Sequence, residues 1–209
     1  MDFQLLDLYT LVPEIFLLIG VSAILLLDLF LSEKQRDVTF FFSLIVLVIT
    51  SILPWFFYDV DPRVIMNGLI VSDSLGAALK SFLCLLIAVG LVYSKKYLLS
   101  RGLHRGEYFS LTLFATLGMM VMISSNHFLS LYLGLELLSL SLYAMVALQR
   151  DSGRSSEAAI KYFILGAIAS GMLLYGMSMI YGATGNLNID AIVASILADD
   201  ADSTLLRLG

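Results

Sequence analysis

The stretch HFLSLYLGLELLSLSLYAMVAL, from His127 to Leu148, is apolar over a length that crosses a bilayer as one helix. Its only acidic or basic side chain apart from the initial histidine is Glu136, which lies near its middle. An ionised side chain at that depth costs roughly 3 kcal/mol or more, so it requires a partner or a function. The stretch therefore predicts a membrane helix with a carboxyl group near the midplane.

The composition of the whole chain also predicts a membrane protein. Of its 209 residues, 59% are hydrophobic and 14% are charged, which leaves too little polar surface for a water-soluble domain. The net charge is -5 and the twelve basic residues form no patch, so no nucleic-acid partner is expected. A single cysteine, Cys84, excludes an internal disulfide and a cysteine-ligated cluster, and two distant histidines argue against haem or zinc. We expect no cofactor or metal in this chain.

The apolar runs predict an all-α, polytopic transmembrane bundle of about six spans within residues 1–185. Pro54 lies inside the second run and is expected to kink or end it. Residues 186–209 are expected to form an outer loop, with an interfacial helix near 189–198 and the beginning of a further span whose remainder is missing, as in a fragment. The six spans are expected at residues 11–31, 38–58, 69–93, 108–124, 127–148 and 158–181.

Basic residues predict the orientation of these spans, because lysine and arginine collect on the cytoplasmic side of a membrane. Alternate loops hold eight of the twelve basic residues, whereas the opposite side has only Arg63 and Arg207. This pattern predicts an amino terminus on the outer, periplasmic side. The eight are Lys34, Arg36, Lys95, Lys96, Arg101, Arg105, Arg150 and Arg154.

Polar residues follow Glu136 along one face of its helix. Tyr132, Glu136, Ser139 and Tyr143 have the i, i+4, i+7, i+11 spacing of a narrow arc. Hydrocarbon favours a neutral carboxyl group and an approaching cation favours the ionised form, so Glu136 could change protonation state as a proton relay requires. The structural alternative is a neutral acid that hydrogen-bonds a neighbouring helix and contributes about 1 kcal/mol.

Lys161 lies near the cytoplasmic end of the sixth expected span. Glu157 precedes it by four residues, in the favourable order for a helical ion pair, so a snorkelling surface pair and a functional lysine are equally compatible with the spacing. Ala159, Gly166 and Ser170 occupy roughly the opposite face. We expect that small-residue face to pack closely on a neighbouring helix and to turn Lys161 away from it.

The remaining charged residues at membrane depth favour structural roles. Asp73, with Ser72, is expected to cap a helix, and Lys80 to extend outward toward it; both are secondary candidates for proton transfer.

Glu14 and Asp28 are expected to be interfacial anchors. His127 is expected to be an interfacial or capping residue, although histidine also suits proton exchange at a surface. Cys84 is expected to be a small core residue.

Two blocks of the sequence resemble a known family. The segment from Asn126 to Val146, which contains GLELLSL, and the segment from Ser155 to Ile189, which contains EAAIKYF, resemble subunit N of proton-pumping NADH:quinone oxidoreductase, respiratory complex I. Residues 13–31 are similar to the first span of that subunit. The family often has a proline where this chain has Ser141, and its members are more than twice as long, with further lysines on later spans.

The resemblance implies an antiporter-like membrane subunit in which Glu136 and Lys161 belong to the proton-translocating set. It implies partner subunits that carry FMN, iron-sulfur clusters and the quinone site, a neighbouring antiporter-like subunit, small membrane subunits, and a location in a bacterial inner membrane or an organellar energy-transducing membrane. Tyr132, Tyr143, Glu157 and His127 are secondary candidates.

Two other functions remain open from the sequence. One is a related subunit of a multisubunit sodium/proton antiporter or of a membrane-bound hydrogenase, which share the glutamate and lysine pattern. The other is a non-transporting scaffold in which Glu136 only holds helices together.

Overall fold

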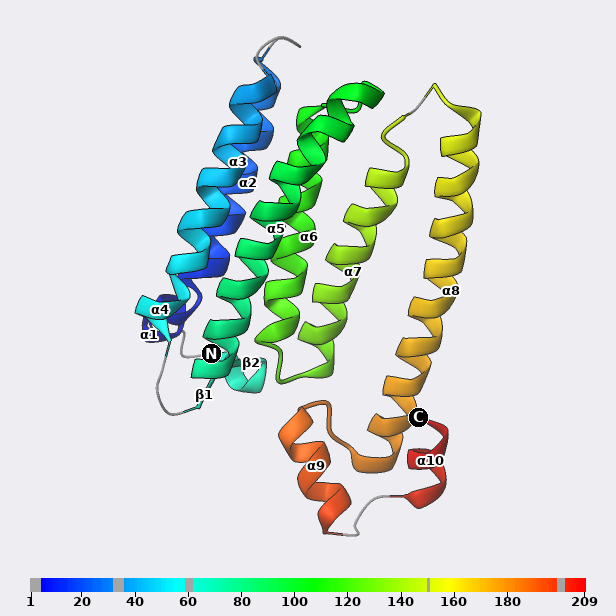
Figure 1. Ribbon diagram of the computed structural model, residues 1–209. Coiled ribbons are helices and arrows are strands. Elements are labelled where there is room, and N and C mark those ends of the chain that lie inside the picture. The colour runs from blue at the N-terminus through cyan, green and yellow to red at the C-terminus, as the bar shows by residue number, and fades with distance from the viewer. Residues whose placement is uncertain (1–4, 32–35, 59–61, 150, 199–201) are drawn as a thin grey trace.

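The computed structural model describes residues 5–31, 36–58, 62–149, 151–198 and 202–209. Six long helices run side by side, up and down, as Figure 1 shows. The expected all-α membrane bundle is confirmed, whereas nothing in the fold decides which end faces the periplasm. Lys34 and Arg150, which support the predicted orientation, lie outside the described residues. The six helices are α2 (Val12–Asp28), α3 (Arg36–Ile52), α5 (Ser74–Arg101), α6 (Gly106–Ile123), α7 (Phe128–Val146) and α8 (Gly153–Thr184).

Most of these helices are long enough to cross a bilayer. Among the described residues, five segments have the required length and apolar composition, the first being Arg36–Phe57, which joins α3 to the short α4 (Pro54–Phe57). The helix α2 has 17 residues, at the lower limit of about 17 to 25 for a membrane helix. It runs beside the others over the same height (Figure 1). The described residues therefore contain five candidate membrane spans, and the sixth, at α2, stays a prediction.

Pro54 ends the regular part of the second span. The helix α3 stops at Ile52, and Pro54 occupies the first position of α4, where its missing N–H is not needed. The break expected from the sequence is therefore confirmed.

A β-hairpin occupies the residues before α5. Strands β1 (Arg63–Ile65) and β2 (Ile70–Ser72) pair antiparallel, and the 3-10 turn η2 (Met66–Gly68) joins them. The turn requires positive φ angles at Met66, Asn67 and Gly68, of 53°, 56° and 92°. The expectation that the third span begins at residue 69 is wrong, because β-branched residues flank an Asn-Gly turn here and favour a hairpin.

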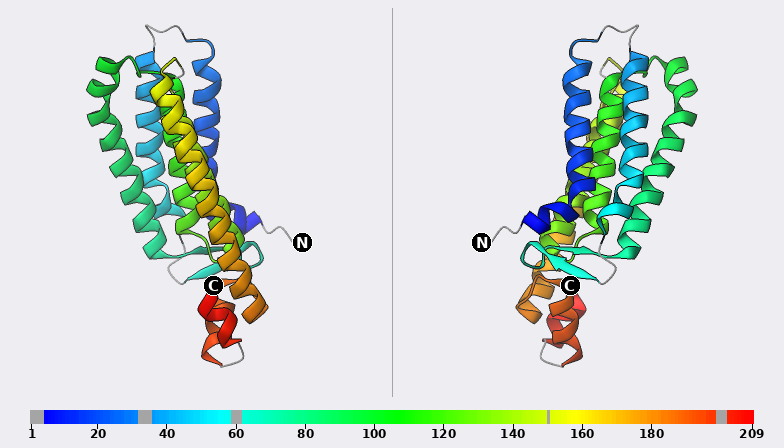
Figure 2. Two further views of the ribbon diagram at one scale, coloured as in Figure 1. Left: turned by 90° about the vertical axis from the view of Figure 1, so that its right-hand side faces the viewer. Right: turned by 90° about the vertical axis from the view of Figure 1, so that its left-hand side faces the viewer.

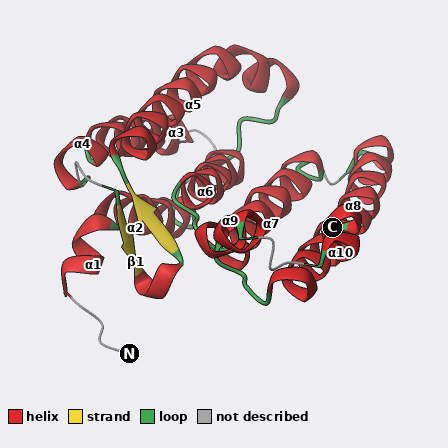
Figure 3. Cartoon of the chain, turned by 90° about the horizontal axis from the view of Figure 1, so that it is seen from below, coloured by secondary structure: helices red, strands yellow, loops and turns green. Residues whose placement is uncertain are grey.

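Three loops meet at the end of the bundle that carries this hairpin. The Val71 N–H donates to the Ser124 carbonyl at 2.8 Å, and the Asn126 N–H to the Leu69 carbonyl at 3.1 Å. The Phe128 N–H donates to the Leu187 carbonyl at 2.9 Å. These backbone bonds connect the hairpin, the α6–α7 turn and the segment after α8, and Figure 3 views this end from below.

The last part of the chain forms two short helices. The helix α9 (Ile189–Leu197) lies where an interfacial helix was expected. Residues expected to begin a further span form α10 (Ser203–Leu208), which lies beside the lower end of α8 in Figure 1. The remaining short helix is α1 (Leu5–Thr10), next to the start of α2.

The apolar core lies among α2, α3, α5 and α6, whereas α8 lies at one side of the bundle (Figures 1 and 2). On α8 only Met177 and Ala183 are buried, so most of its side chains face away from the described residues. The fully buried side chains at the centre of the core include Leu17, Leu47, Leu91, Phe109, Leu113 and Met120.

Candidate functional site

Glu136 is the ninth of the 19 residues of α7, at the middle of a helix that can cross a membrane. Its side chain is half-buried between α7 and α8. The start of α7 is fixed by His127, whose Nδ1 accepts the Leu129 N–H at 3.1 Å. The capping role expected for His127 is therefore confirmed.

The carboxylate of Glu136 has a hydroxyl partner on α8. The Ser170 hydroxyl donates to Glu136 Oε1, and it lies 3.1 Å from the Tyr132 hydroxyl. Ser170 is the donor in both contacts, and because a serine hydroxyl has a single proton it serves one of them at a time. The three side chains form a short hydrogen-bonded chain of two hydroxyls that ends on a carboxylate. By rotating, the Ser170 hydroxyl can shift its hydrogen bond between the Glu136 carboxylate and the Tyr132 oxygen.

Tyr143 extends the same face of α7 toward the other end of the bundle. Its ring packs edge-on against Tyr162 and Phe163 of α8, with ring centroids 4.9 and 5.6 Å away. Its hydroxyl end lies against Gly166, where an added Cβ would be 1.7 Å from the hydroxyl oxygen. The predicted polar stripe therefore faces α8, and the missing side chain at Gly166 makes room for Tyr143.

Lys161 lies on a different side of α8. Its Nζ is 2.5 Å from Glu157 Oε1, and the two side chains are 70% and 65% exposed. The expected i, i+4 ion pair is therefore present. Lys161 and Ser170 are nine residues apart, which corresponds to opposite helix faces and roughly 13 Å along the axis. The predicted packing of small residues is confirmed, because Gly166 and Ser170 face α7 and Lys161 does not.

Lys80 lies inside the bundle, as expected, but its partner is Glu14 and not Asp73. Its Nζ lies 2.5 Å from Glu14 Oε1, and the two side chains are only 11% and 9% exposed. Asp73 instead caps α5, accepting the Gly76 N–H at 2.7 Å, as expected. The interpretation of Glu14 as an interfacial anchor is wrong, because its side chain is buried and paired with Lys80.

Two other side chains are tied into the helix packing. Asp28 accepts the Thr39 hydroxyl at 3.0 Å, and its carboxylate lies so close to Gly106 that a Cβ there would be 1.8 Å from Oδ1. Asp28 thereby connects α2 to α3 and α6. Cys84 is fully buried with its Sγ 3.9 Å from the Met120 sulfur, so its predicted core position is confirmed.

The sequence did not identify Ser170 as the partner of Glu136, or Glu14 as the partner of Lys80. Ser170 carried a signal, since it belongs to the small-residue face of α8. Glu14 carried none beyond its charge, because its partner comes from a helix distant in sequence. Within the described ranges, no group of three or more histidine, cysteine or carboxylate side chains is arranged to hold a metal ion.

Residues 125–208 match the family model described as NADH:quinone oxidoreductase/Mrp antiporter, TM. The chain is 50% identical over 209 residues to NADH-quinone oxidoreductase subunit N of Nitrosomonas europaea, covering 100% of this chain and 44% of that protein. It is 52% identical over 202 residues to subunit N of Thiobacillus denitrificans, covering 97% of this chain and 42% of that protein. The chain thus spans less than half the length of these relatives.

Solved structures agree with the sequence relatives. A chain of respiratory complex I from Thermus thermophilus with bound aureothin matches at a TM-score of 0.70 and 28% identity, over 94% of this chain and 40% of that chain. A chain of an archaeal membrane-bound sulfane sulfur reductase matches at a TM-score of 0.74 and 22% identity, over 95% and 42%, a likeness of fold alone. The resemblance of the GLELLSL and EAAIKYF blocks is confirmed, and the chain is a multi-pass protein of the bacterial inner membrane.

Proposed function

We propose that this chain, a homologue of subunit N of NADH-quinone oxidoreductase, takes part in proton translocation within the membrane arm of such an enzyme. The observation that carries the proposal is Glu136, a carboxyl group at the middle of a membrane helix with a hydroxyl chain attached. Intramembrane carboxyl groups are costly and mark ion or proton paths.

Glu136 is the group that changes charge in this proposal. When the carboxyl group is ionised, Ser170 stabilises it by donating a hydrogen bond; when it is protonated, the same hydroxyl can accept. Tyr132 and Ser170 therefore hold the carboxyl group in place in both states and provide a route for its proton between α7 and α8.

Lys161 acts on Glu136 only at a distance. An axial spacing of roughly 13 Å between Lys161 and Ser170, the partner of Glu136, and an effective dielectric constant of about 20 correspond to about 1.3 kcal/mol between unit charges. Its pairing with Glu157 reduces this further. We propose that Lys161 tunes the proton affinity of Glu136 and that Glu157 modulates this effect.

The redox chemistry belongs to partner subunits. Iron-sulfur clusters are held by several cysteine thiolates, which the one cysteine of this chain cannot supply. We therefore propose that the chain assembles with other membrane subunits, including a neighbouring antiporter-like subunit, and that the enzyme transfers electrons from NADH to a quinone. The chain itself carries out no redox step.

Replacing Glu136 by glutamine in the assembled complex tests the proposal. E136Q keeps the shape and the hydrogen bond to Ser170 but cannot be ionised, so we expect normal assembly and a large loss of proton translocation in membrane vesicles. D151N, in the exposed turn before α8, is the matched control and should pump normally. Normal pumping by E136Q would contradict the proposal and leave only the scaffold function.

A second candidate is a subunit of a multisubunit sodium/proton antiporter, because the description of the matching family model covers both machines. Membrane-bound hydrogenase subunits belong to the same alternative. The genes adjacent to this one distinguish these machines, since the first proposal requires neighbours that encode flavin, iron-sulfur and quinone-site subunits.

A further inference from the structure

A buried charge pair lies in a part of the bundle that does not include Glu136. Glu14 is the third residue of α2, and Lys80 lies two turns into α5, at the end of the bundle where the β-hairpin lies. Glu136, by contrast, faces α8 at the middle of α7. The two sites share no residue, so they can be tested separately.

The hydrogen bonds of this pair leave one atom without a partner. Lys80 Nζ lies 2.5 Å from Glu14 Oε1, and the Ser124 hydroxyl donates to the same oxygen at 3.3 Å. Glu14 Oε2 is buried and has no hydrogen-bond partner in the described part of the chain. Burying an ion pair costs several kcal/mol per ion unless hydrogen bonds satisfy the remaining lone pairs. A pair that served only to join helices would be expected to satisfy both oxygens.

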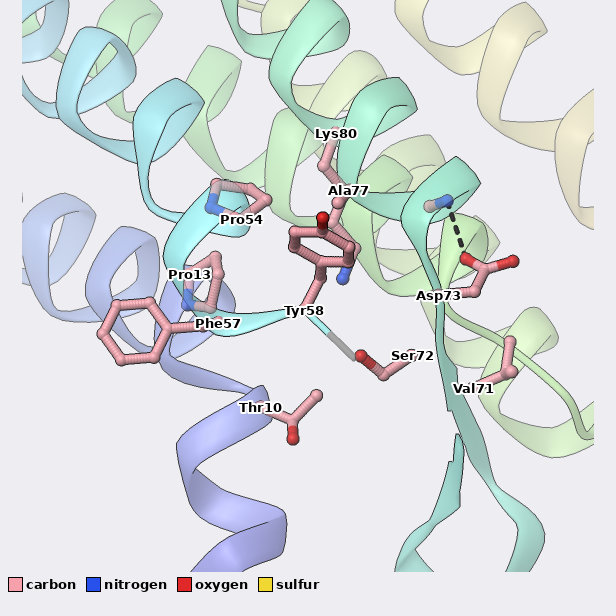
Figure 4. A pocket seen from close by; sticks show the side chains of 11 residues that line it. Thr10, Pro13, Pro54, Phe57, Tyr58, Val71, Ser72, Asp73, Ala77 and Lys80 are labelled. Carbon is pink, nitrogen blue, oxygen red and sulfur yellow. Dashed lines mark hydrogen bonds between the residues drawn. The ribbon is translucent and has the colours of Figure 1, made fainter. Parts of the chain in front are cut away.

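Lys80 also lines a small cavity, seen from close by in Figure 4. The cavity volume is about 10 Å³, close to the minimum that holds one water molecule. Thr10, Ser72 and Asp73 provide polar groups in its wall, and Pro13 of α2 faces them. Lys80 thus has Glu14 on one side and a water-sized polar space on the other.

Among the described groups around the pair, Glu14 and Lys80 are the two charges that face each other. Asp73 and Tyr58 line the cavity, and Cys84 lies one turn beyond Lys80 on α5, within electrostatic reach of both charges. Asp73 is already engaged as the cap of α5. From α6, the uncharged Ser124 contacts Glu14, and α3 has no titratable residue in its last ten positions.

We propose that Glu14 and Lys80 form a second proton-exchange site, which communicates with water through the cavity beside Thr10 and Ser72. The Lys80 ammonium first passes a proton to Glu14 Oε1, and the neutral amine that remains then takes a proton from a hydronium ion in the cavity. The products are water, a charged lysine and a neutral carboxylic acid, and the reverse steps return the proton. A role of this exchange in transport rests on the proposed function, whereas the exchange itself does not.

Infrared difference spectra of the purified complex between two pH values test the exchange without measuring pumping. We expect a carbonyl band of a protonated carboxyl group that is lost in E14Q, shifted in K80R and unchanged in E136Q and D151N. K80R keeps the charge pair, so it remains informative if E14Q fails to assemble. A band that is unaffected in both E14Q and K80R would overturn the proposal, even if E136Q abolishes pumping.

Access of water to the cavity is the second measurement. A cysteine at Thr10 should react with a small water-soluble thiol reagent at least about tenfold faster than one at Ser43, which is fully buried on α3 and reacts only when the bundle opens. The native Cys84, also fully buried, provides the background rate in the unmodified protein. Equal rates at Thr10 and Ser43 would show that no water reaches Lys80, which would also overturn the proposal.

Discussion

Gly118 of α6 and Gly134 of α7 face each other at backbone contact. A Cβ added at Gly118 would lie 2.6 Å from the Gly134 carbonyl oxygen, and one added at Gly134 would lie 2.8 Å from that of Gly118. Small residues that bring helix backbones together are a common basis of packing in membranes. The contact fixes α7, and with it Glu136, against the core.

We therefore expect G134A to destabilise the protein. The contact is with backbone, which cannot rotate away, so the helices must separate at a cost of about 1 to 3 kcal/mol. Thermal release of this subunit from the purified complex measures the change. G171A is the control, since nothing lies within 4 Å of a Cβ at that position of α8. Release of the subunit at the same temperature in G134A and G171A would contradict the role of this contact in stability.

The hydroxyl of Ser170 should matter for transport more than for stability. S170A removes the only described partner of the Glu136 carboxylate and interrupts the chain from Tyr132, whereas S170T retains a hydroxyl. We expect S170A to assemble and to pump several-fold more slowly, with S170T between it and the parent. S178A, which removes an exposed hydroxyl of the same helix, is the control. The prediction fails if S170A and S178A pump equally well.

Lys161 should contribute little to folding. Exposed i, i+4 pairs on helices contribute roughly 0.3 to 0.5 kcal/mol, and this pair is largely exposed among the described residues. K161M should therefore leave the thermal midpoint almost unchanged while it slows proton translocation in vesicles. If K161M strongly lowers stability while the remaining complexes pump normally, the role of Lys161 is structural and the prediction is wrong.

Asp73 should show the opposite behaviour. D73A removes the cap of α5 and should lower the stability by about 1 kcal/mol, the usual cost of a lost N-cap, and D73S should restore most of it. Because Asp73 is engaged with the Gly76 N–H, we expect both variants to translocate protons normally once assembled. Slower pumping by D73S at normal stability would instead place Asp73 in the proton route.

Hydropathy predicted the helices well because each long helix is apolar around most of its circumference, and that property is local in sequence. For the residues just before α5, hydropathy predicted the start of a membrane helix, whereas the structure has a hairpin. Val71 and its neighbours are apolar enough to extend the run from Leu69, and only the Asn67–Gly68 turn signals a hairpin. A window that averages hydropathy cannot detect a turn of two residues.

Only those features of the site that a single helix determines could be predicted from the sequence. The face of α7 that carries Tyr132 and Glu136 follows from spacing, as does the opposition of Lys161 and Ser170 on α8. Which helix that face meets is a property of the packed bundle. The pairing of Glu14 with Lys80 depends on how α2 and α5 are placed in the bundle, and no periodicity within either helix encodes it.

The backbone bonds that join the three loops hold one end of α8, whereas its other end is held by side chains, among them Ser155, whose hydroxyl donates to the Val146 carbonyl at 2.7 Å. The Phe128–Leu187 bond anchors the segment just after α8, while the helix beyond Ser170 toward Gly153 has few buried contacts. This arrangement makes α8 a lever pivoted at Thr184. Distances along the helix axis imply that any tilt carries Lys161 roughly one and a half times as far as Ser170. A rotation that moves the Glu136 contact only slightly would thus move the lysine by about half as much again.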